Sequence, residues 1–533
     1  MKLYHFLSQL LLNRRWPWVG AVVVHFLLGF MLFDRFPVGA YQDDAWYVAG
    51  AMGLAKGLGY TQPWTPNLLP ETYLPVGYSL FLVPWVWLFP MSFKPLVMWS
   101  LLASAATVAG SYWYYRQVND SVLWAWLGML LFAVNTMLVE FSTLVMSEAS
   151  YLLVTMMVIL VVYRWSDKAE VPIIIYWLIG FGATVGYFVR IWGLALVVAV
   201  IVYYMMRRRW GGVIGACVPF LLMYTVWLRR NMSLGGRGGS YGINNDVISK
   251  VPDVLETTLV SESLVVLFTQ DLPNLLVPIF SQRIEDLLAV FYLGPLLGFL
   301  ALGLIGLILL GGVKQMATEI TVAELYVGAY VGIILLVPFS GRYWLPLLPF
   351  LIHYMLLGLQ TVIDGCSRFV KQRKVLEGVV LVSLLLVAGL HIFRVVQKEL
   401  DPIQNELPNV SIGAEWIGAQ VVEEGGEQVT IMAAKPQMTY IYSEQTVVPY
   451  PEKSGGEYAV LEGREEHLWG YFKAKVEAED VDYILIEPIL RLGPLMRSAY
   501  AEEILIPNMM VDERFSLVFS DEPSLVLVFR VGE

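Results

Sequence analysis

Long apolar runs recur along most of the chain, separated by short polar connections. The first extends from about Trp16 to Phe33, long enough to cross the ~30 Å hydrocarbon layer of a membrane. Such runs, taken with their flanking charges, predict about eleven membrane-spanning helices. They lie near residues 16–36, 94–115, 121–139, 146–164, 172–189, 191–206, 211–228, 287–312, 322–339, 343–361 and 376–393.

Basic residues occupy every second connection between these predicted spans. Asn13-Arg14-Arg15 precedes the first span, Arg207-Arg208-Arg209 follows a later one, and a basic cluster occupies residues 368–374. Lys and Arg in short loops mark the cytoplasmic side. We therefore predict a multi-pass protein of the cell (inner) membrane, with a cytoplasmic N-terminus and with Asp43 and Asp44 at the outer face.

Residues 73–90 are apolar and aromatic, but Pro75, Gly77 and Pro84 interrupt them. Counting them as a span would invert every later loop, so we interpret them as an interfacial or re-entrant helix. Together with a short helix expected over residues 45–57, they make the first outside loop, residues 37–93, far longer than a simple connection.

A second long outside loop is expected over residues 229–286. Its glycine-rich stretch, Gly235 to Gly239, indicates mobility rather than nucleotide binding, because the context of a phosphate-binding loop is missing.

After Phe393 the pattern changes to short alternating segments. They predict a helix from Ser411 to Gly425, an acidic helix through Glu465 and Tyr471, and strands over residues 429–433, 446–449, 481–487, 515–519 and 525–531. Such alternation is typical of a small α/β domain. We therefore expect a polytopic α-helical membrane domain over residues 1–398 and an extracytoplasmic α/β domain over residues 399–533.

Composition supports this division. Hydrophobic residues make up 57% of the chain and charged residues 15%, which is more apolar than soluble proteins are. Residues 399–533 hold 25 acidic and 9 basic residues, a balance of −16, so the net charge of −10 leaves +6 on the preceding part. An acidic outer domain gives no support for nucleic-acid binding. The two cysteines, Cys217 and Cys366, indicate neither a disulfide framework nor a Cys/His metal cluster.

Asp43 and Asp44 lie where the first predicted span meets the outer face. A carboxylate within bonding distance can take the proton of an attacking hydroxyl group, so either residue is a candidate general base. Adjacent carboxylates on a helix point in different directions. The second would orient the loop or help to hold a divalent cation, for which Asp44 is the candidate ligand. The alternative is that the pair caps a helix starting at Ala45.

Glu148 follows Ser147 at the outer end of a predicted span, where a carboxylate is costly unless it is paired or solvated. We expect it to face the same cavity as the aspartates. Acceptor binding, electrostatic positioning and metal support all remain open for it, and a Ser-x-x-Ser helix start is the structural alternative.

Four arginines near outer ends of spans are candidates for stabilising a phosphate leaving group, because their planar fork of donors suits phosphate. Arg342 comes first, Arg190 second, and Arg229 and Arg230 follow. Snorkelling to the membrane interface is the expected alternative for at least one of Arg229 and Arg230. Glu71 is a further candidate for substrate or metal contact, with an ordinary loop glutamate as its alternative.

Five segments, in this order along the chain, resemble the GT-C superfamily of polyprenyl-phosphate-dependent glycosyltransferases, especially the protein mannosyltransferase-like and aminoarabinose transferase-like branch. Each motif is weak alone, and the set is more specific through its order and common side. The segments are Asp43-Asp44-Ala45-Trp46-Tyr47, Tyr73-Leu74-Pro75-Val76-Gly77-Tyr78, Met146-Ser147-Glu148, Trp227-Leu228-Arg229-Arg230-Asn231 and Gly341-Arg342-Tyr343-Trp344-Leu345-Pro346-Leu347-Leu348-Pro349.

The resemblance implies an integral-membrane glycosyltransferase that moves a hexosyl or pentosyl group by a single inverting displacement. The donor would be a polyprenyl-phosphate sugar, and the acceptor a protein, a lipid or a cell-wall glycan at the outer side. On these motifs Tyr78 and Tyr343 join the arginines as substrate-binding candidates. One departure leaves the donor and acceptor open, since the aminoarabinose branch has Lys-Pro-Pro where this chain has Tyr73-Leu74-Pro75.

Other classes of function remain as alternatives. A membrane transporter or lipid flippase would also contain intramembrane charges and broken helices, but it is expected to show two halves with matching interrupted segments. The sequence shows no such repeat. A non-catalytic scaffold would tolerate replacement of Asp43 and Asp44.

Overall fold

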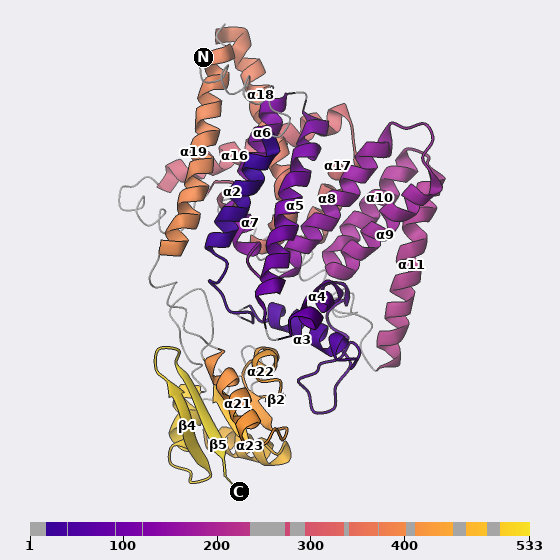
Figure 1. Ribbon diagram of the computed structural model, residues 1–533. Coiled ribbons are helices and arrows are strands. Elements are labelled where there is room, and N and C mark those ends of the chain that lie inside the picture. The colour runs from indigo at the N-terminus through magenta and orange to yellow at the C-terminus, as the bar shows by residue number, and fades with distance from the viewer. Residues whose placement is uncertain are drawn as a thin grey trace.

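The computed structural model describes residues 17–39, 41–90, 92–119, 121–234, 272–277, 294–334, 341–370, 373–400, 411–450, 465–487 and 501–532. A bundle of long helices forms one part, and a small α/β domain lies beyond one end of it (Figure 1). The expected architecture of a helical membrane protein with a C-terminal α/β domain is therefore confirmed. The expected boundary between residues 398 and 399 remains a prediction, as α19 continues to Leu400.

Each predicted span coincides with a helix. Among the described residues, six stretches are long and apolar enough to cross a membrane; the total number of spans remains a prediction. The helices are α2 (Pro17–Met31), α5 (Lys94–Val118), α6 (Val122–Ala133), α8 (Ser147–Ser166), α9 (Ile173–Val189), α10 (Leu194–Met206), α11 (Trp210–Ser233), α16 (Gly294–Thr318), α17 (Val322–Ile334), α18 (Leu348–Val370) and α19 (Arg373–Leu400).

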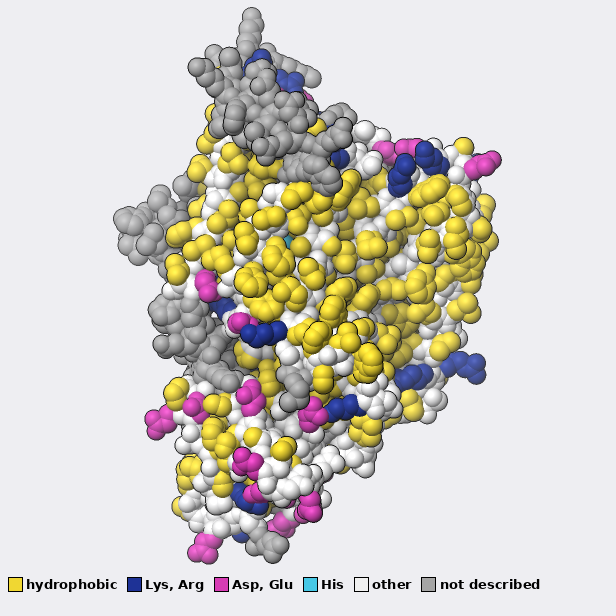
Figure 2. All heavy atoms as spheres, in the orientation of Figure 1, with side chains coloured by type: hydrophobic (Ala, Val, Ile, Leu, Met, Phe, Trp, Pro, Cys, Tyr) yellow, Lys and Arg dark blue, Asp and Glu magenta, His cyan; other side chains and the backbone are white. Residues whose placement is uncertain are grey.

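The surface of the bundle is apolar. Figure 2 shows hydrophobic side chains spread over the helices, with most Lys, Arg, Asp and Glu side chains nearer the two ends. Leu222, Val226 and Phe299 are 63%, 70% and 73% exposed, respectively. A soluble protein rarely exposes so large an apolar patch. Lipid is the solvent that fits this surface, so the chain is a multi-pass membrane protein.

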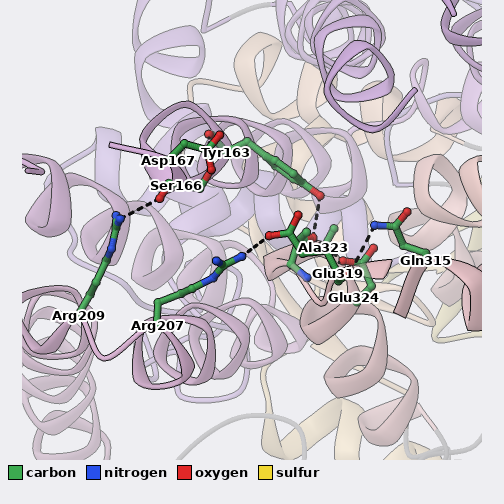
Figure 3. Close-up of polar contacts among 10 residues, drawn as sticks. Tyr163, Ser166, Asp167, Arg207, Arg209, Gln315, Glu319, Ala323 and Glu324 are labelled. Atoms are coloured by element: carbon green, nitrogen blue, oxygen red, sulfur yellow. Dashed lines mark hydrogen bonds and ion pairs between the residues drawn. The ribbon is translucent and has the colours of Figure 1, made fainter. Parts of the chain in front are cut away.

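Polar contacts tie the helix connections at the end of the bundle remote from the α/β domain (Figure 3). Arg209 donates to the backbone carbonyl oxygen of Ser166 at 2.9 Å, and Arg207 forms an ion pair with Glu319. The basic residues expected on the cytoplasmic side thus also hold neighbouring helix ends together.

Two short helices lie between the bundle and the α/β domain (Figure 1). They are α3 (Asp43–Ala55) and α4 (Gly77–Leu88), which pack against each other. Helix α4 corresponds to the predicted interfacial helix, with Pro84 inside it. It crosses the C-terminal end of α9 so closely that a Cβ atom on Gly77 would lie 2.4 Å from the carbonyl oxygen of Phe188. Only glycine permits this approach.

The C-terminal domain contains a five-stranded sheet of order β2-β1-β3-β5-β4. Its strands are β1 (Thr430–Ala433), β2 (Thr446–Pro449), β3 (Tyr483–Ile486), β4 (Phe515–Asp521) and β5 (Val526–Val531). The first three are parallel, whereas β5 pairs antiparallel with β3 and β4. Because β2 and β3 flank β1, the connection from β2 to β3 passes the first strand.

The helices of this domain are α21 (Ile412–Glu423), α22 (Pro436–Ser443), α23 (Glu465–Ala478) and α24 (Ile506–Met509). The sequence predicted α21, α23 and all five strands, but neither α22 nor α24. Helix α22 packs against α21 and β2 on its own domain and against α3 on the membrane part. The predicted glycine-rich stretch at residues 235–239 lies outside the described residues, and the outside loops at 37–93 and 229–286 remain predictions of topology.

Candidate active site

Asp43 and Asp44 begin α3, and their carboxylates point in different directions. Gln42 precedes them with a φ of 63°, in the left-handed region, which turns the chain at the helix start. Asp43 accepts a hydrogen bond from Arg342 Nη2 at 2.9 Å. Asp44 instead accepts from the backbone N–H groups of Gly39 at 2.7 Å and Ala45 at 3.0 Å. Asp44 therefore holds the preceding loop, whereas Asp43 faces a cation.

The two carboxylates also differ in burial. Asp44 is 1% exposed, whereas the Asp43 side chain is 28% exposed. Burial raises the pKa of Asp44 to about 6, and the N–H groups of Gly39 and Ala45 oppose that rise. Both Asp44 oxygens thus accept backbone N–H groups, one from the preceding loop and one from α3. Of the two, Asp43 is the carboxylate that a substrate can reach.

Arg342 and Arg190 approach the same aromatic ring. Arg342 belongs to η4 (Gly341–Leu347), a 3-10 helix that leads into α18. Arg190 lies between α9 and η1 (Ile191–Gly193), where the chain is extended. The guanidinium carbons lie 5.4 Å and 5.5 Å from the ring centroid of Tyr343, within cation–π range. Tyr343 therefore lies next to both positive charges.

These groups enclose a small cavity of about 30 Å³. This is about the share of liquid volume that one water molecule takes up, so the space is too small for a sugar phosphate in this conformation. Tyr47, Leu74 and Trp192 were not predicted as site residues, although Tyr47 and Leu74 lie in two of the five segments that resemble the GT-C superfamily. The cavity is lined by Asp43, Tyr47, Leu74, Pro75, Arg190, Ile191, Trp192, Arg342 and Tyr343.

Glu148 lies behind this cavity rather than in its lining. It is the second residue of α8, it is fully buried, and its Oε1 is 2.9 Å from Arg190 Nη1. The same nitrogen donates to Ser147 Oγ at 2.9 Å. The start of α8 therefore neutralises and aims Arg190, as a buried charge requires.

Glu71 and Arg230 hold the loop over residues 37–93 together and are not among the residues that line this cavity. Glu71 is buried and accepts from the backbone N–H of Leu74 at 3.1 Å and from Trp46 Nε1 at 2.5 Å. Arg230 donates to the carbonyl oxygens of Glu71 at 2.8 Å and Tyr60 at 2.7 Å. Their observed contacts are those of loop-holding residues.

The remaining two candidates lie apart from the cavity lining. Arg229 is exposed on α11. Tyr78 is buried in α4, and its ring meets that of Tyr47 edge-on at a centroid distance of 4.9 Å. Tyr78 therefore supports a ring that lines the cavity.

An apolar groove opens on the other side of the same wall. Its volume is about 590 Å³, and α4, α9 and α11 supply its lining, with Arg230 at the polar end. Val76 and Gly77 line the groove, while Leu74 and Pro75 line the small cavity. The two spaces are therefore separated by one stretch of chain.

No protein-family model matches the chain, and no curated protein matches it by sequence. Solved structures do match. ArnT from Cupriavidus metallidurans in the apo state aligns with a TM-score of 0.56 at 13% identity, over 96% of this chain and 97% of ArnT. ArnT bound to undecaprenyl phosphate aligns equally well, over 97% and 98%.

The second similar fold belongs to the archaeal oligosaccharyltransferase AglB from Archaeoglobus fulgidus, in complex with an inhibitory peptide and a dolichol-phosphate. It aligns with a TM-score of 0.52 at 10% identity, over 89% of this chain and 69% of AglB. At such low identities the similarity establishes the fold alone. The chain therefore has the GT-C fold that its sequence motifs resemble.

Proposed function

We propose that this protein is a glycosyltransferase that moves a sugar from a polyprenyl-phosphate carrier to an acceptor hydroxyl group at the outer side of the membrane. One observation carries the proposal: Asp43, Arg190 and Arg342 line one cavity. A displacement at a sugar carbon needs a base on one side and positive charge for the departing phosphate on the other. The GT-C fold supports the same class of reaction.

In this mechanism Asp43 takes the proton from the acceptor hydroxyl as its oxygen bonds to the anomeric carbon. The bond from that carbon to the phosphate oxygen breaks, and its electron pair remains on the phosphate. Arg342 and Arg190 stabilise that charge, while Glu148 and Tyr343 hold the arginines in place. One displacement from the opposite face inverts the configuration of the sugar.

The apolar groove is our candidate for the polyprenyl chain. It opens beside the wall of the cavity, so a chain lying there brings its phosphate toward the arginines. The similar structures support a lipid phosphate ligand, since ArnT is bound to undecaprenyl phosphate and AglB is in complex with a dolichol-phosphate. A protein, a lipid and a cell-wall glycan remain the candidate acceptors.

The cavity has to open before a sugar phosphate can enter it. The Asp43–Arg342 contact is the polar link across it, and a lipid phosphate competes directly with Asp43 for the guanidinium group. We infer that donor binding releases Asp43 and leaves it free to act as the base. The donor then binds before the acceptor is deprotonated.

The sequence makes Asp44 a candidate ligand for a divalent cation. The Archaeoglobus fulgidus oligosaccharyltransferase also forms a complex with Zn and sulfate. Here both Asp44 oxygens accept backbone N–H groups, and the described residues form no group of three or more His, Cys, Asp or Glu suited to a metal. Asp44 does not fit the role of ligand, and no step is assigned to a metal.

Lipid-linked sugars in cells test the proposal. Cells whose only copy carries Asp43→Asn are expected to accumulate a polyprenyl-phosphate sugar, because loss of a general base lowers the rate by about 10²–10⁴-fold. Asp34→Asn is the matched control, since Asp34 is an exposed carboxylate near the start of the same loop, paired with Lys94.

Equal lipid-linked sugar levels in wild-type and Asp43→Asn cells would refute the assigned base. Accumulation of the carrier lipid in the inner leaflet alone would support the flippase alternative instead.

A further inference from the structure

Helix α22 is the element of the C-terminal domain that contacts the start of the candidate active site. Seven of its eight residues are buried, from Pro436 to Ile441 and Ser443, although it belongs to a small domain. One side packs on α21 and β2, and another packs on α3 of the membrane part. The burial around the helix follows from this position between two domains.

Its first contact fixes the backbone before α3. The Tyr442 hydroxyl donates to the carbonyl oxygen of Val38 at 2.9 Å. The Tyr442 ring also meets Phe93 edge-on, with centroids 5.2 Å apart. A hydrogen bond between positions 404 residues apart ties the two domains at this point.

Its second contact fixes the next residue. Gly39 has a φ of +102°, and a Cβ atom there would lie 2.7 Å from Met438 Cγ. The Met438 side chain therefore occupies the space that any other residue at position 39 would need. Two side chains of α22 therefore contact two adjacent residues: Tyr442 contacts Val38, and Met438 contacts Gly39.

The segment held in this way is the one that holds Asp44. The Gly39 N–H donates to Asp44 Oδ2 at 2.7 Å. The C-terminal domain also contacts the other end of α3, at its C-cap residue Lys56. There, Lys56 Nζ lies 2.6 Å from Glu444 Oε2. In addition, the backbone N–H of Val447 donates to the Trp64 carbonyl oxygen at 2.7 Å.

We propose that α22 sets the position of the base, with Tyr442 and Met438 as positioning residues that act through Val38, Gly39 and Asp44. The inference rests on the proposed function, in which Asp43 must be aimed at the acceptor. Asp43 directly precedes Asp44, so movement of the held segment rotates the start of α3 and misdirects its carboxylate. The C-terminal domain is then part of the catalytic apparatus.

Two substitutions test this proposal in the full-length protein. Tyr442→Phe removes one hydroxyl group and keeps the ring, and Met438→Ala removes the side chain that packs on Gly39. Both are expected to lower kcat by about 10- to 100-fold with little change in the KM for the donor, because small misplacements of a reacting group have such effects. Tyr471→Phe is the control, as Tyr471 is an exposed tyrosine of the same domain.

The proposal also predicts a structural signal that needs no substrate. Hydrogen exchange of the Gly39 amide is expected to be at least about tenfold faster in Tyr442→Phe and Met438→Ala than in wild type, because its bond to Asp44 opens more often. Adding Tyr442→Phe to Asp43→Asn is expected to cost no further activity, since the base that it positions is already absent.

Wild-type kcat together with wild-type exchange at Gly39 in both variants would overturn the inference. Faster exchange with unchanged kcat would show a structural brace without a catalytic role, which also overturns it. If the wild-type protein transfers no sugar, the proposed function fails, and the exchange measurement alone decides whether α22 holds the segment.

Discussion

Asp43 and Asp44 are neighbours in the chain but lie in opposite environments. Asp44 is buried against backbone N–H groups, whereas Asp43 meets a guanidinium group at the cavity. The capping alternative is wrong, because α3 begins at Asp43 itself, with Gln42 as its N-cap and with no side-chain cap hydrogen bond. At the residue scale, the different contacts of Asp43 and Asp44 lead to two measurable predictions.

The first concerns competition for Arg342. Asp43→Asn is expected to bind undecaprenyl phosphate about 1.4- to 5-fold more tightly than wild type, because it removes a partly exposed ion pair worth about 0.2–1 kcal/mol. Arg342→Ala is expected to bind about 10- to 100-fold more weakly, since a hydrogen bond to a charged group contributes about 1.5–3 kcal/mol. Native mass spectrometry of the purified protein with the lipid measures both changes.

Arg342→Lys is the matched control, as it keeps the charge, loses the forked donors and should fall between these limits. Unchanged binding in Arg342→Ala would move the phosphate site to Arg190.

The second prediction concerns pH. The folded pKa of Asp44, about 6, lies above its ordinary value of 3.8, so the folded state holds a proton that the unfolded state has lost between these values. The free energy of unfolding contributed by Asp44 is therefore highest below about pH 4 and is lost as pH rises to about 6. Asp43 and Lys435 are the nearby charged groups.

Thermal unfolding of wild type and Asp44→Asn between pH 4 and 7 measures this effect. The stability of wild type relative to Asp44→Asn is expected to fall with rising pH in that window and then level off. A constant difference at every pH would contradict the raised pKa.

At the scale of elements, close backbone crossings decide where the site lies. Helix α4 meets the C-terminal end of α9 at Gly77, and the stretch between Leu74 and Gly77 forms the wall between cavity and groove. The segment Pro75-Val76-Gly77 therefore borders both candidate binding spaces.

Gly77→Ala is expected to destabilise the protein by about 1–3 kcal/mol, because the added methyl group overlaps the Phe188 carbonyl. Gly328→Ala is the control, since a Cβ atom at Gly328 in α17 meets no atom within 4 Å. Chemical denaturation of both variants in the same detergent compares them. Equal unfolding midpoints would show that the crossing is looser than the structure indicates.

At the scale of the whole molecule, charge and architecture agree on an orientation. The end of the bundle with Arg207 and Arg209 lies away from the α/β domain, and the acidic domain lies beside the candidate site (Figure 1). The positive-inside rule then predicts that the candidate site and the α/β domain face outward together.

Fusion reporters measure this topology. A reporter of outer-side location placed after Glu533 is expected to be active, and the same reporter placed between Val370 and Arg373 is expected to be silent. Reversed activities would mean that α4 crosses the membrane or that another span was miscounted.

The sequence by itself determined the membrane class, the position of a helix at each predicted span, the short helix that we interpret as interfacial (α4), and the strands of the α/β domain. These features depend on the length and period of nearby apolar residues, which a local pattern contains. It also placed Asp43, Arg190 and Arg342 near one face, because loop charges fix which helix ends lie together.

Only the tertiary structure decided which carboxylate faces the cavity, that Glu148 pairs with Arg190, and that α22 holds Val38 and Gly39. Asp43 and Arg342 are 299 residues apart, and Tyr442 and Val38 are 404 apart, so no local pattern connects them. Helix α22 is also too short to show a helical period in its sequence. Its position depends on packing between two domains, which forms only when the whole chain is folded.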